Sequence, residues 1–125
     1  MKTTVYSQHQ EHIVWLNKLS FYTDDMAIMQ KRIEEIAKKN TAKEVQVQVE
    51  HFQNQLLIQS NDMDEIKRHI KQDENQLTDN VLKNETAVDH RKVEDHAVER
   101  ADVKAFEDNF NQLRKELNHF VAQWM

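Results

Sequence analysis

The chain has 125 residues, a formal net charge of −5, and no glycine, proline or cysteine. Without glycine and proline, folds built from many tight turns are excluded, and without cysteine there are no disulfides, thiolate metal ligands or cysteine nucleophiles. Acidic and basic residues are interspersed, which disfavours a nucleic-acid partner. Charged residues make up 31% and hydrophobic residues 38%, a mixture typical of long helices with one polar face. We therefore expect one all-α domain, residues 1–125.

The first predicted helix covers about residues 5–39, starting at Thr4 or at Ser7, where Ser7 and Gln10 fit a capping box. Its apolar residues recur at steps of three and four, as on a helix with one buried stripe. The predicted stripe is Val5, His9, His12, Leu16, Leu19, Tyr22 or Thr23, Met26, Met29, Ile33 and Ile36. Asn40 follows, and we expect it to take the left-handed conformation that glycine usually supplies at a helix end.

The central predicted helix covers about residues 42–78 and begins with a capping box in the sequence Thr-Ala-Lys-Glu at 41–44. Its stripe is Val45, Val49, Phe52, Leu56, Gln59, Met63, Ile66, Ile70, Asp73 and Leu77. A break at Ser60, Asn61 and Asp62 would give four shorter helices. The stripe passes this point without losing phase, so we favour one continuous helix.

The third predicted helix covers about residues 86–124, with Thr86 as its cap. The turn before it is expected within residues 78–85, with Asn80 or Asn84 in the left-handed conformation. The stripe continues through Asp89, Val93, His96, Glu99 or Arg100, Val103, Phe106, Phe110, Leu113, Leu117, Phe120 and Trp124.

Three helices of similar length joined by short turns predict an elongated, up-down-up antiparallel three-helix bundle. This arrangement is similar to spectrin-type repeats, which also have a Trp on the first helix, here Trp15. Such a resemblance implies a structural or protein-interaction role.

A polar group of residues is predicted at the end of the bundle distant from the first turn. Reflecting the helices about their turns brings histidines from all three to a similar height, together with carboxylates. The candidate metal ligands are His9, His12, His69, Asp73, His96 and Glu99. Imidazole and carboxylate suit zinc, iron or manganese. Neither the hemerythrin-like His-x-x-x-His motif nor the ferritin-like pair of Glu-x-x-His motifs on two helices occurs, so no ligand set is transferred from those families.

Three interpretations of this group follow from the sequence. The first is a polar layer that fixes the register of a non-catalytic structural or interaction bundle, with a protein partner or self-association. The alternative is a metal-binding protein, and a third is a pH-dependent opening of that end. No phosphate loop or Ser-His-Asp set can be placed, so we expect no enzyme and, under the first interpretation, no cofactor. The N-terminal residues lack the apolar core of a signal peptide and no run is long enough to span a membrane, so we expect a cytoplasmic protein without a membrane partner.

Overall fold

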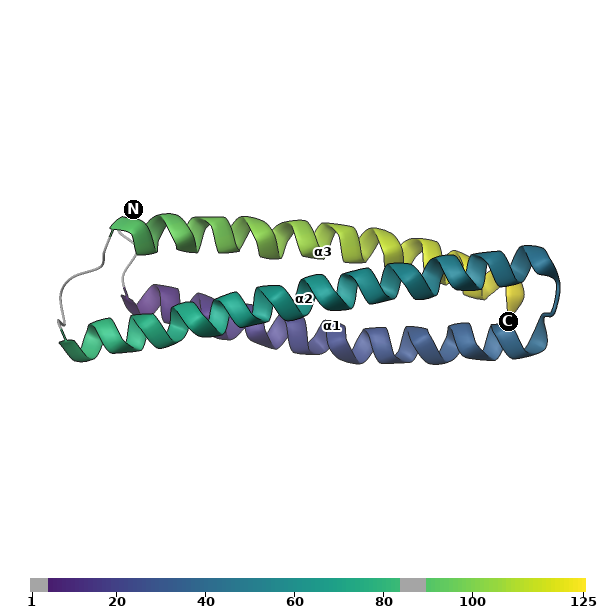
Figure 1. Cartoon of the computed structure of the whole chain (residues 1–125), viewed down its shortest axis with the longest axis horizontal. Helices are drawn as coiled ribbons and strands as arrows, with labels where there is room; N and C mark the ends of the chain where they lie inside the picture. Colours follow the sequence, from purple (N-terminus) through teal and green to yellow (C-terminus); the bar gives the residue numbers. More distant parts are fainter. Residues whose placement is uncertain (1–4, 84–89) are drawn as a thin grey trace.

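The structure, a computed structural model, describes residues 5–83 and 90–125. It contains the helices α1 (Val5–Lys39), α2 (Lys43–Lys83) and α3 (His90–Trp124), and no strand within the described residues. Figure 1 shows the three helices lying side by side along one long axis. Helices α1 and α3 run in the same direction, and α2 runs in the opposite direction. The predicted all-α, up-down-up three-helix bundle is confirmed.

The core follows a regular heptad on every helix, because only positions three and four apart lie on the same face of a helix. The buried residues of α1 are Gln8, His12, Trp15, Leu19, Met26, Met29, Ile33 and Ile36. The predicted stripe is therefore correct from Leu19 onward. Before that residue it is correct at His12 but one position off at two places, because Gln8 and Trp15 are buried where His9 and Leu16 were expected. Stepping back from Leu19 by four, three and four reaches Trp15, His12 and Gln8, which is the phase that the rest of the helix keeps.

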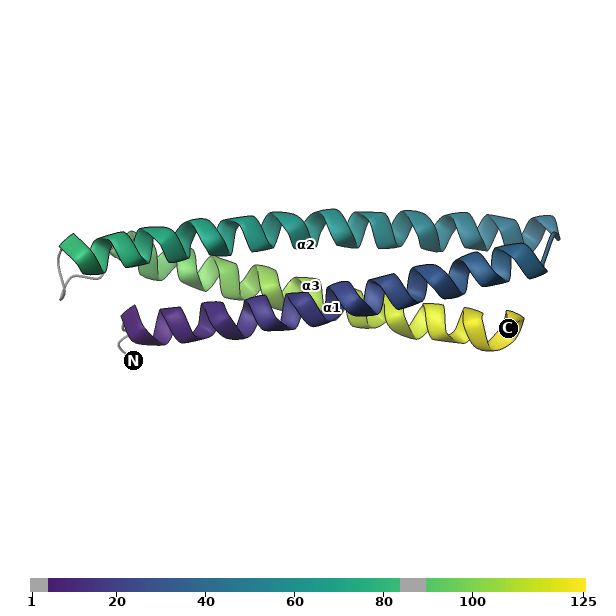
Figure 2. The same ribbon diagram turned by 90° about the horizontal axis from the view of Figure 1, so that it is seen from below.

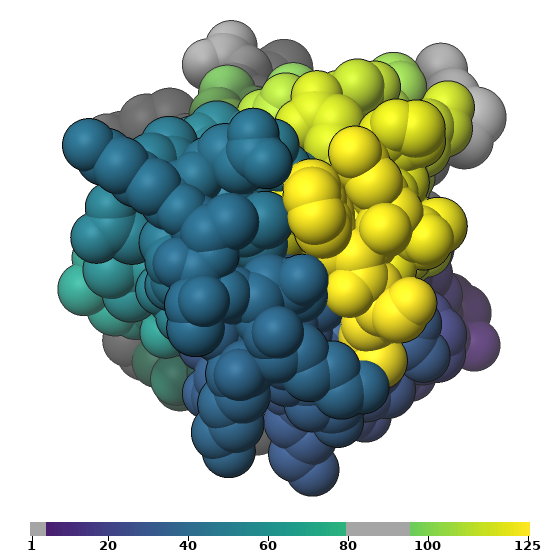
Figure 3. All heavy atoms as spheres, turned by 90° about the vertical axis from the view of Figure 1, so that its right-hand side faces the viewer, coloured from purple at the N-terminus to yellow at the C-terminus, as the bar shows by residue number. Residues whose placement is uncertain are grey.

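The first turn closes without the left-handed residue that we expected at Asn40, since no φ angle is positive in residues 5–83 and 90–125. Instead of a glycine cap, two side-chain amides donate hydrogen bonds to the carbonyl groups at the end of α1. Gln46 Nε2 donates to the carbonyls of Asn40 (2.6 Å) and Ala37 (3.2 Å), and Asn40 Nδ2 donates to that of Ile36 (3.1 Å). Asn40 Nδ2 also reaches the carbonyl of Trp124 at 3.4 Å, tying the turn to the end of α3. Figure 3 shows this end of the bundle, with the C-terminal residues packed against the turn.

Helix α2 is continuous through Ser60, Asn61 and Asp62, as predicted. It begins at Lys43, one residue later than expected. The carbonyl of Ala42 accepts its first hydrogen bonds, from the N–H groups of Val45 and Gln46, in place of the capping box expected at Thr41. The predicted end near residue 78 is wrong, because the helix continues to Lys83 and includes Asn80.

Thr78, at the predicted end, does not stop the helix. Its hydroxyl donates to the carbonyl of Glu74 one turn earlier, at 3.0 Å, so it is satisfied inside the helix and does not compete with it. No glycine or proline stops the chain at this point. The expected cap at Thr86 and the alternative turn residue Asn84 lie outside the described residues.

A ladder of ion pairs sets the register of α1 against α3. Glu11 pairs with Arg100 at 2.6 Å, Lys18 pairs with Glu107 at 3.4 Å, and Asp25 pairs with Arg114. Each pair joins residues 89 positions apart, and the sign of the charge on α1 alternates at every step. A slip by one heptad would place like charges opposite one another, so the ladder disfavours neighbouring registers. We call this set the α1–α3 ladder.

We expect the Asp25–Arg114 pair to show a favourable coupling energy of about 0.5–1 kcal/mol, since both side chains are partly buried. Arg114 also packs over the Phe110 ring, 5.0 Å from its centre, so a single substitution measures more than the pair. A double-mutant cycle with Asp25→Asn and Arg114→Gln, which remove the charges without creating like-charge pairs, isolates the coupling in urea unfolding. The exposed pair Lys104–Asp108 is the control and should couple more weakly. A coupling of zero for Asp25–Arg114 would contradict a register-setting role.

Candidate metal centre

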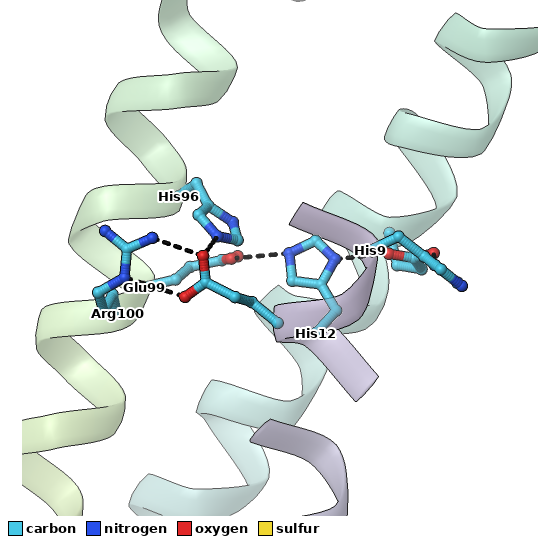
Figure 4. Close-up of polar contacts among 7 residues, drawn as sticks. His9, His12, His96, Glu99 and Arg100 are labelled. Carbon is cyan, nitrogen blue, oxygen red and sulfur yellow. Dashed lines mark hydrogen bonds and ion pairs between the residues drawn. The ribbon is translucent and has the colours of Figure 1, made fainter. Parts of the chain in front are cut away.

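Three buried side chains from α1 and α3 meet near the end of the bundle at which α1 begins. His12 comes from α1 and is 1% exposed, while His96 and Glu99 come from successive inward positions of α3 and are 3% and 6% exposed. One potential ligand atom from each residue lies within 4.8 Å of the others. In Figure 4 the labelled side chains of His12 and Glu99 point toward each other across the gap between the two helices, with His96 beside them.

His12 uses both ring nitrogens, one outward and one inward. Its Nδ1 lies 2.5 Å from Glu74 Oε2, and because a carboxylate can only accept, this nitrogen carries the donated proton. Its Nε2 lies 3.3 Å from Glu99 Oε2 without the alignment of a hydrogen bond. Burial alone would lower the pKa of His12, but the carboxylates of Glu99 and Glu74 outweigh it and the pKa is raised.

His96 has a similar outer partner. Its Nε2 lies 3.1 Å from Glu11 Oε1, and Glu11 is itself held by two hydrogen bonds from Arg100, at 2.6 and 3.0 Å. The pKa of His96 is lowered, chiefly because burial disfavours the imidazolium, and Glu11 opposes this only in part. The Arg100 hydrogen bonds are the largest cause that lowers the pKa of Glu11 and keeps it ionised. His96 is therefore a neutral imidazole whose Nδ1 is buried without a hydrogen-bond partner.

Glu99 is the least satisfied group of the centre. Both of its carboxylate oxygens are buried and neither makes a hydrogen bond of good geometry. Burial raises the pKa of Glu99 to about 7, an effect that the neighbouring Asp73 carboxyl on α2 reinforces and His12 opposes. A buried carboxylate without donors is costly, typically by about 1–3 kcal/mol or more. A bound cation would remove that cost.

The surroundings of the centre are built from aromatic and amide side chains. The Trp15 ring stacks on His96, with ring centres 4.8 Å apart, and lies 5.8 Å from the His12 ring. The two imidazole rings are themselves 5.1 Å apart. Gln8, one turn before His12, is buried with its Nε2 atom unpartnered. Trp15 thus lies against both histidines and provides a spectroscopic reporter next to the centre.

Two of the predicted ligands do not join this group. His9 is nearly half exposed and forms an ion pair with Glu74, on the far side of that carboxylate from the centre. His69 is exposed and lines a shallow groove between α2 and α3, with Glu65 and Asp102 among its neighbours. Its position is adjacent to the buried Ile70 on the helix, so its side chain points away from the core. The structure therefore brings together His12, His96 and Glu99, with Asp73 beside Glu99, out of the six predicted residues.

Two important outer residues, Glu74 and Glu11, were not predicted from the sequence. Glu74 directly follows the stripe position Asp73, and Glu11 directly precedes His12, so each lies at the edge of the core rather than in it. Burial raises the pKa of Glu74, but the hydrogen bonds from His12 and His9 prevail and the pKa is lowered. The charged positions next to a heptad stripe are the ones that reach across to a neighbouring helix, and this rule was available from the sequence.

No protein-family model, curated protein or solved structure matches this chain, so its function has to be inferred from the centre itself.

Proposed function

We propose that this protein binds one divalent transition-metal ion between His12, His96 and Glu99. The observation that carries the proposal is the orientation of the two histidines. Each gives one ring nitrogen to an outer carboxylate, Glu74 or Glu11, and keeps the other nitrogen buried without a hydrogen bond. Metal-ligating histidines typically donate their second ring nitrogen to a carboxylate in this way, because the carboxylate fixes the tautomer and makes the free nitrogen a better ligand.

The distances are compatible with such an ion. Ligand bonds of about 2.0–2.2 Å place two atoms of a tetrahedral site about 3.3–3.6 Å apart. His12 Nε2 and Glu99 Oε2 are already 3.3 Å apart, and one potential ligand atom from each of the three residues lies within 4.8 Å of the others. Two imidazoles and a carboxylate suit zinc, iron or manganese, and the neighbouring Asp73 provides a further oxygen.

A register-fixing polar layer explains these residues less completely. In that interpretation His12, as an imidazolium, satisfies Glu74 and Glu99. Such a layer is expected to have its polar atoms paired, because a buried unpaired group destabilises the fold. Here Nδ1 of His96 and Oε1 of Glu99 have no partner among the described residues. A metal ion would give both atoms a bond at once.

The test is a titration of metal-stripped protein, prepared without a His tag, with zinc, manganese and, under anaerobic conditions, Fe²⁺. We expect saturation at one ion per chain and a rise in the melting temperature of about 10 °C when the free metal exceeds its dissociation constant about 100-fold. In a Trp124→Phe background, Co²⁺ should quench the fluorescence of Trp15, which stacks on His96. A melting temperature unmoved by metal or chelator, together with unquenched Trp15, would contradict the proposal.

A second function, as a structural or protein-interaction module, is favoured by a separate observation. Large apolar side chains remain exposed on α1, among them Val14, Phe21 and Ile28. Within residues 5–83 and 90–125, none of the helices has an apolar stretch that could cross a lipid bilayer. We propose that the chain acts by binding rather than by catalysis, in the cytoplasm, and that the apolar surface of α1 meets another protein surface.

A further inference from the structure

An apolar stripe runs along the outer surface of α1. Val14, Phe21 and Ile28 are 48%, 61% and 51% exposed, and they follow one another at seven-residue intervals. Residues seven apart on a helix lie on one line, so the three side chains form a straight, regular row. In Figure 2 α1 lies in front of α3, and no other helix of the chain covers it from this side. We call this row the α1 stripe.

Charged residues border the α1 stripe on the side that faces α3. They are Glu11, Lys18, Asp25 and Arg32, again at seven-residue intervals and with alternating sign. The first three form the α1–α3 ladder. The opposite border is formed by Gln10, Asn17, Asp24 and Lys31. An apolar row with patterned charges on both sides is the layout of an interface between helices.

We propose that the α1 stripe is the contact surface of a homodimer in which two α1 helices pack antiparallel about a two-fold axis at Phe21. This arrangement stacks Phe21 on Phe21 of the second copy and Val14 on Ile28 of the second copy, twice. In an antiparallel pair related by a two-fold axis, each border of the stripe faces the same border of the other helix. All three apolar residues of both copies are then covered.

The charges select this register. With Phe21 on the axis, Glu11 faces Arg32 of the second copy, and Lys18 faces Asp25 of the second copy, so every pair on the charged border is attractive. The opposite border pairs Gln10 with Lys31 and Asn17 with Asp24, which brings no like charges together. Charge complementarity of this kind fixes orientation and register more than it adds affinity.

Neighbouring arrangements are disfavoured by the same residues. A shift by one heptad in one direction places Lys18 opposite Lys18 of the second copy and Glu11 opposite Asp25. A shift in the other direction places Asp25 opposite Asp25 and Lys18 opposite Arg32. A parallel pair brings Asp25 beside Asp24 of the second copy and Arg32 beside Lys31. Each alternative therefore contains repulsive pairs that the proposed one lacks.

Arg32 gives a second reason for this orientation. It occupies the fourth step of the α1–α3 ladder, where α3 carries Val121 instead of an acidic residue, and it has no ion-pair partner among the described residues. Phe21, Ile28, Arg32 and Val121 line a groove between α1 and α3 at this point. The second copy would bring Glu11 to Arg32 and apolar side chains to the edge of the groove.

The experiment is sedimentation equilibrium of the full chain up to about 1 mM, where a weak contact between small surfaces would still be populated. We expect a monomer–dimer equilibrium whose dissociation constant rises about 30-fold or more for Phe21→Asp, since a buried aromatic at the centre of an interface dominates its affinity. Tyr6→Asp is the matched control, because Tyr6 is an exposed aromatic of α1 that lies off the stripe, and its effect should be small. A strictly monomeric chain, or a dimer that Phe21→Asp leaves intact, would overturn the proposal.

Cysteine cross-linking tests the orientation, and the chain offers a clean background because it contains no cysteine. Phe21→Cys should form a disulfide with itself. Val14→Cys should cross-link to Ile28→Cys in a mixture, but neither should cross-link to itself. Efficient Val14–Val14 cross-linking would show a parallel dimer and refute the register.

The inference rests on the proposed interaction role and not on the metal centre. Metal titration of Phe21→Asp therefore separates the two proposals, because a monomer that still binds metal leaves the metal proposal intact.

Discussion

His96→Ala is expected to weaken zinc binding by about 100-fold or more while leaving the bundle folded. The substitution removes one of the three proposed ligands, and even outer residues that only orient a ligand typically contribute about 10- to 100-fold to metal affinity. The loss should appear as a higher dissociation constant in competition with a chelator of known affinity. It should also abolish the metal-dependent rise in melting temperature, since the stabilisation by a ligand follows its affinity.

His69→Ala is the matched control for this variant. Both residues are histidines in the same half of the bundle, but His69 is exposed and lies away from the centre. Glu99→Gln provides a second variant that keeps the shape of the side chain and removes its charge, in case the loss of His96 disturbs the packing of Trp15. If His69→Ala lowered the affinity more than His96→Ala or Glu99→Gln, the metal would be bound elsewhere.

Phe110→Ala is expected to destabilise the protein by about 3–5 kcal/mol. Phe110 is fully buried, and its ring lies 4.8 Å from that of Tyr22 and 5.8 Å from that of Phe106. Truncation removes the largest fully buried side chain among the residues whose burial the structure describes, and it leaves a cavity that the surrounding helices close only in part. Because domains are typically stable by only about 5–15 kcal/mol, this is a large fraction of the total. Chemical denaturation followed by circular dichroism measures it.

Phe21→Ala is the same chemical change at an exposed position of the bundle. At high dilution, where self-association does not contribute, it should change the free energy of unfolding by less than about 0.5 kcal/mol. Equal losses for the two variants would contradict the packing of the core. A loss below about 1 kcal/mol for Phe110→Ala would show that this ring is not at the centre of the bundle.

The fold was predictable because one pattern dominates the sequence. Steps of three and four from Val45 to Leu77 and from His96 to Trp124 coincide with the inward positions of α2 and α3. The end of α2 was not, since no glycine or proline marks the residue at which the helix stops. The first turn lies where it was predicted, but its capping was not predicted, because amide hydrogen bonds from Gln46, six residues after Asn40, and from Asn40 itself replace a left-handed residue.

The candidate metal centre could be predicted only in part, because helix periodicity identifies inward positions but not the partners beside them. His12, His96 and Glu99 lie on heptad positions, so periodicity alone places them inside. His9 and His69 are each one position off the heptad, and reflecting helices about their turns matches heights but not directions. The partners Glu11 and Glu74 depend on the lateral register of the helices, which the α1–α3 ladder sets for Glu11 through pairs far apart in the chain.

The most direct test of the metal centre is to crystallise the zinc-loaded protein and collect anomalous diffraction at the zinc absorption edge. We expect a single anomalous peak per chain within about 2.0–2.2 Å of His12 Nε2, Nδ1 of His96 and a Glu99 oxygen, with Glu74 and Glu11 still hydrogen-bonded to the outer ring nitrogens. A peak confined to exposed residues such as His69 or His119, or no ordered peak at all, would contradict the account.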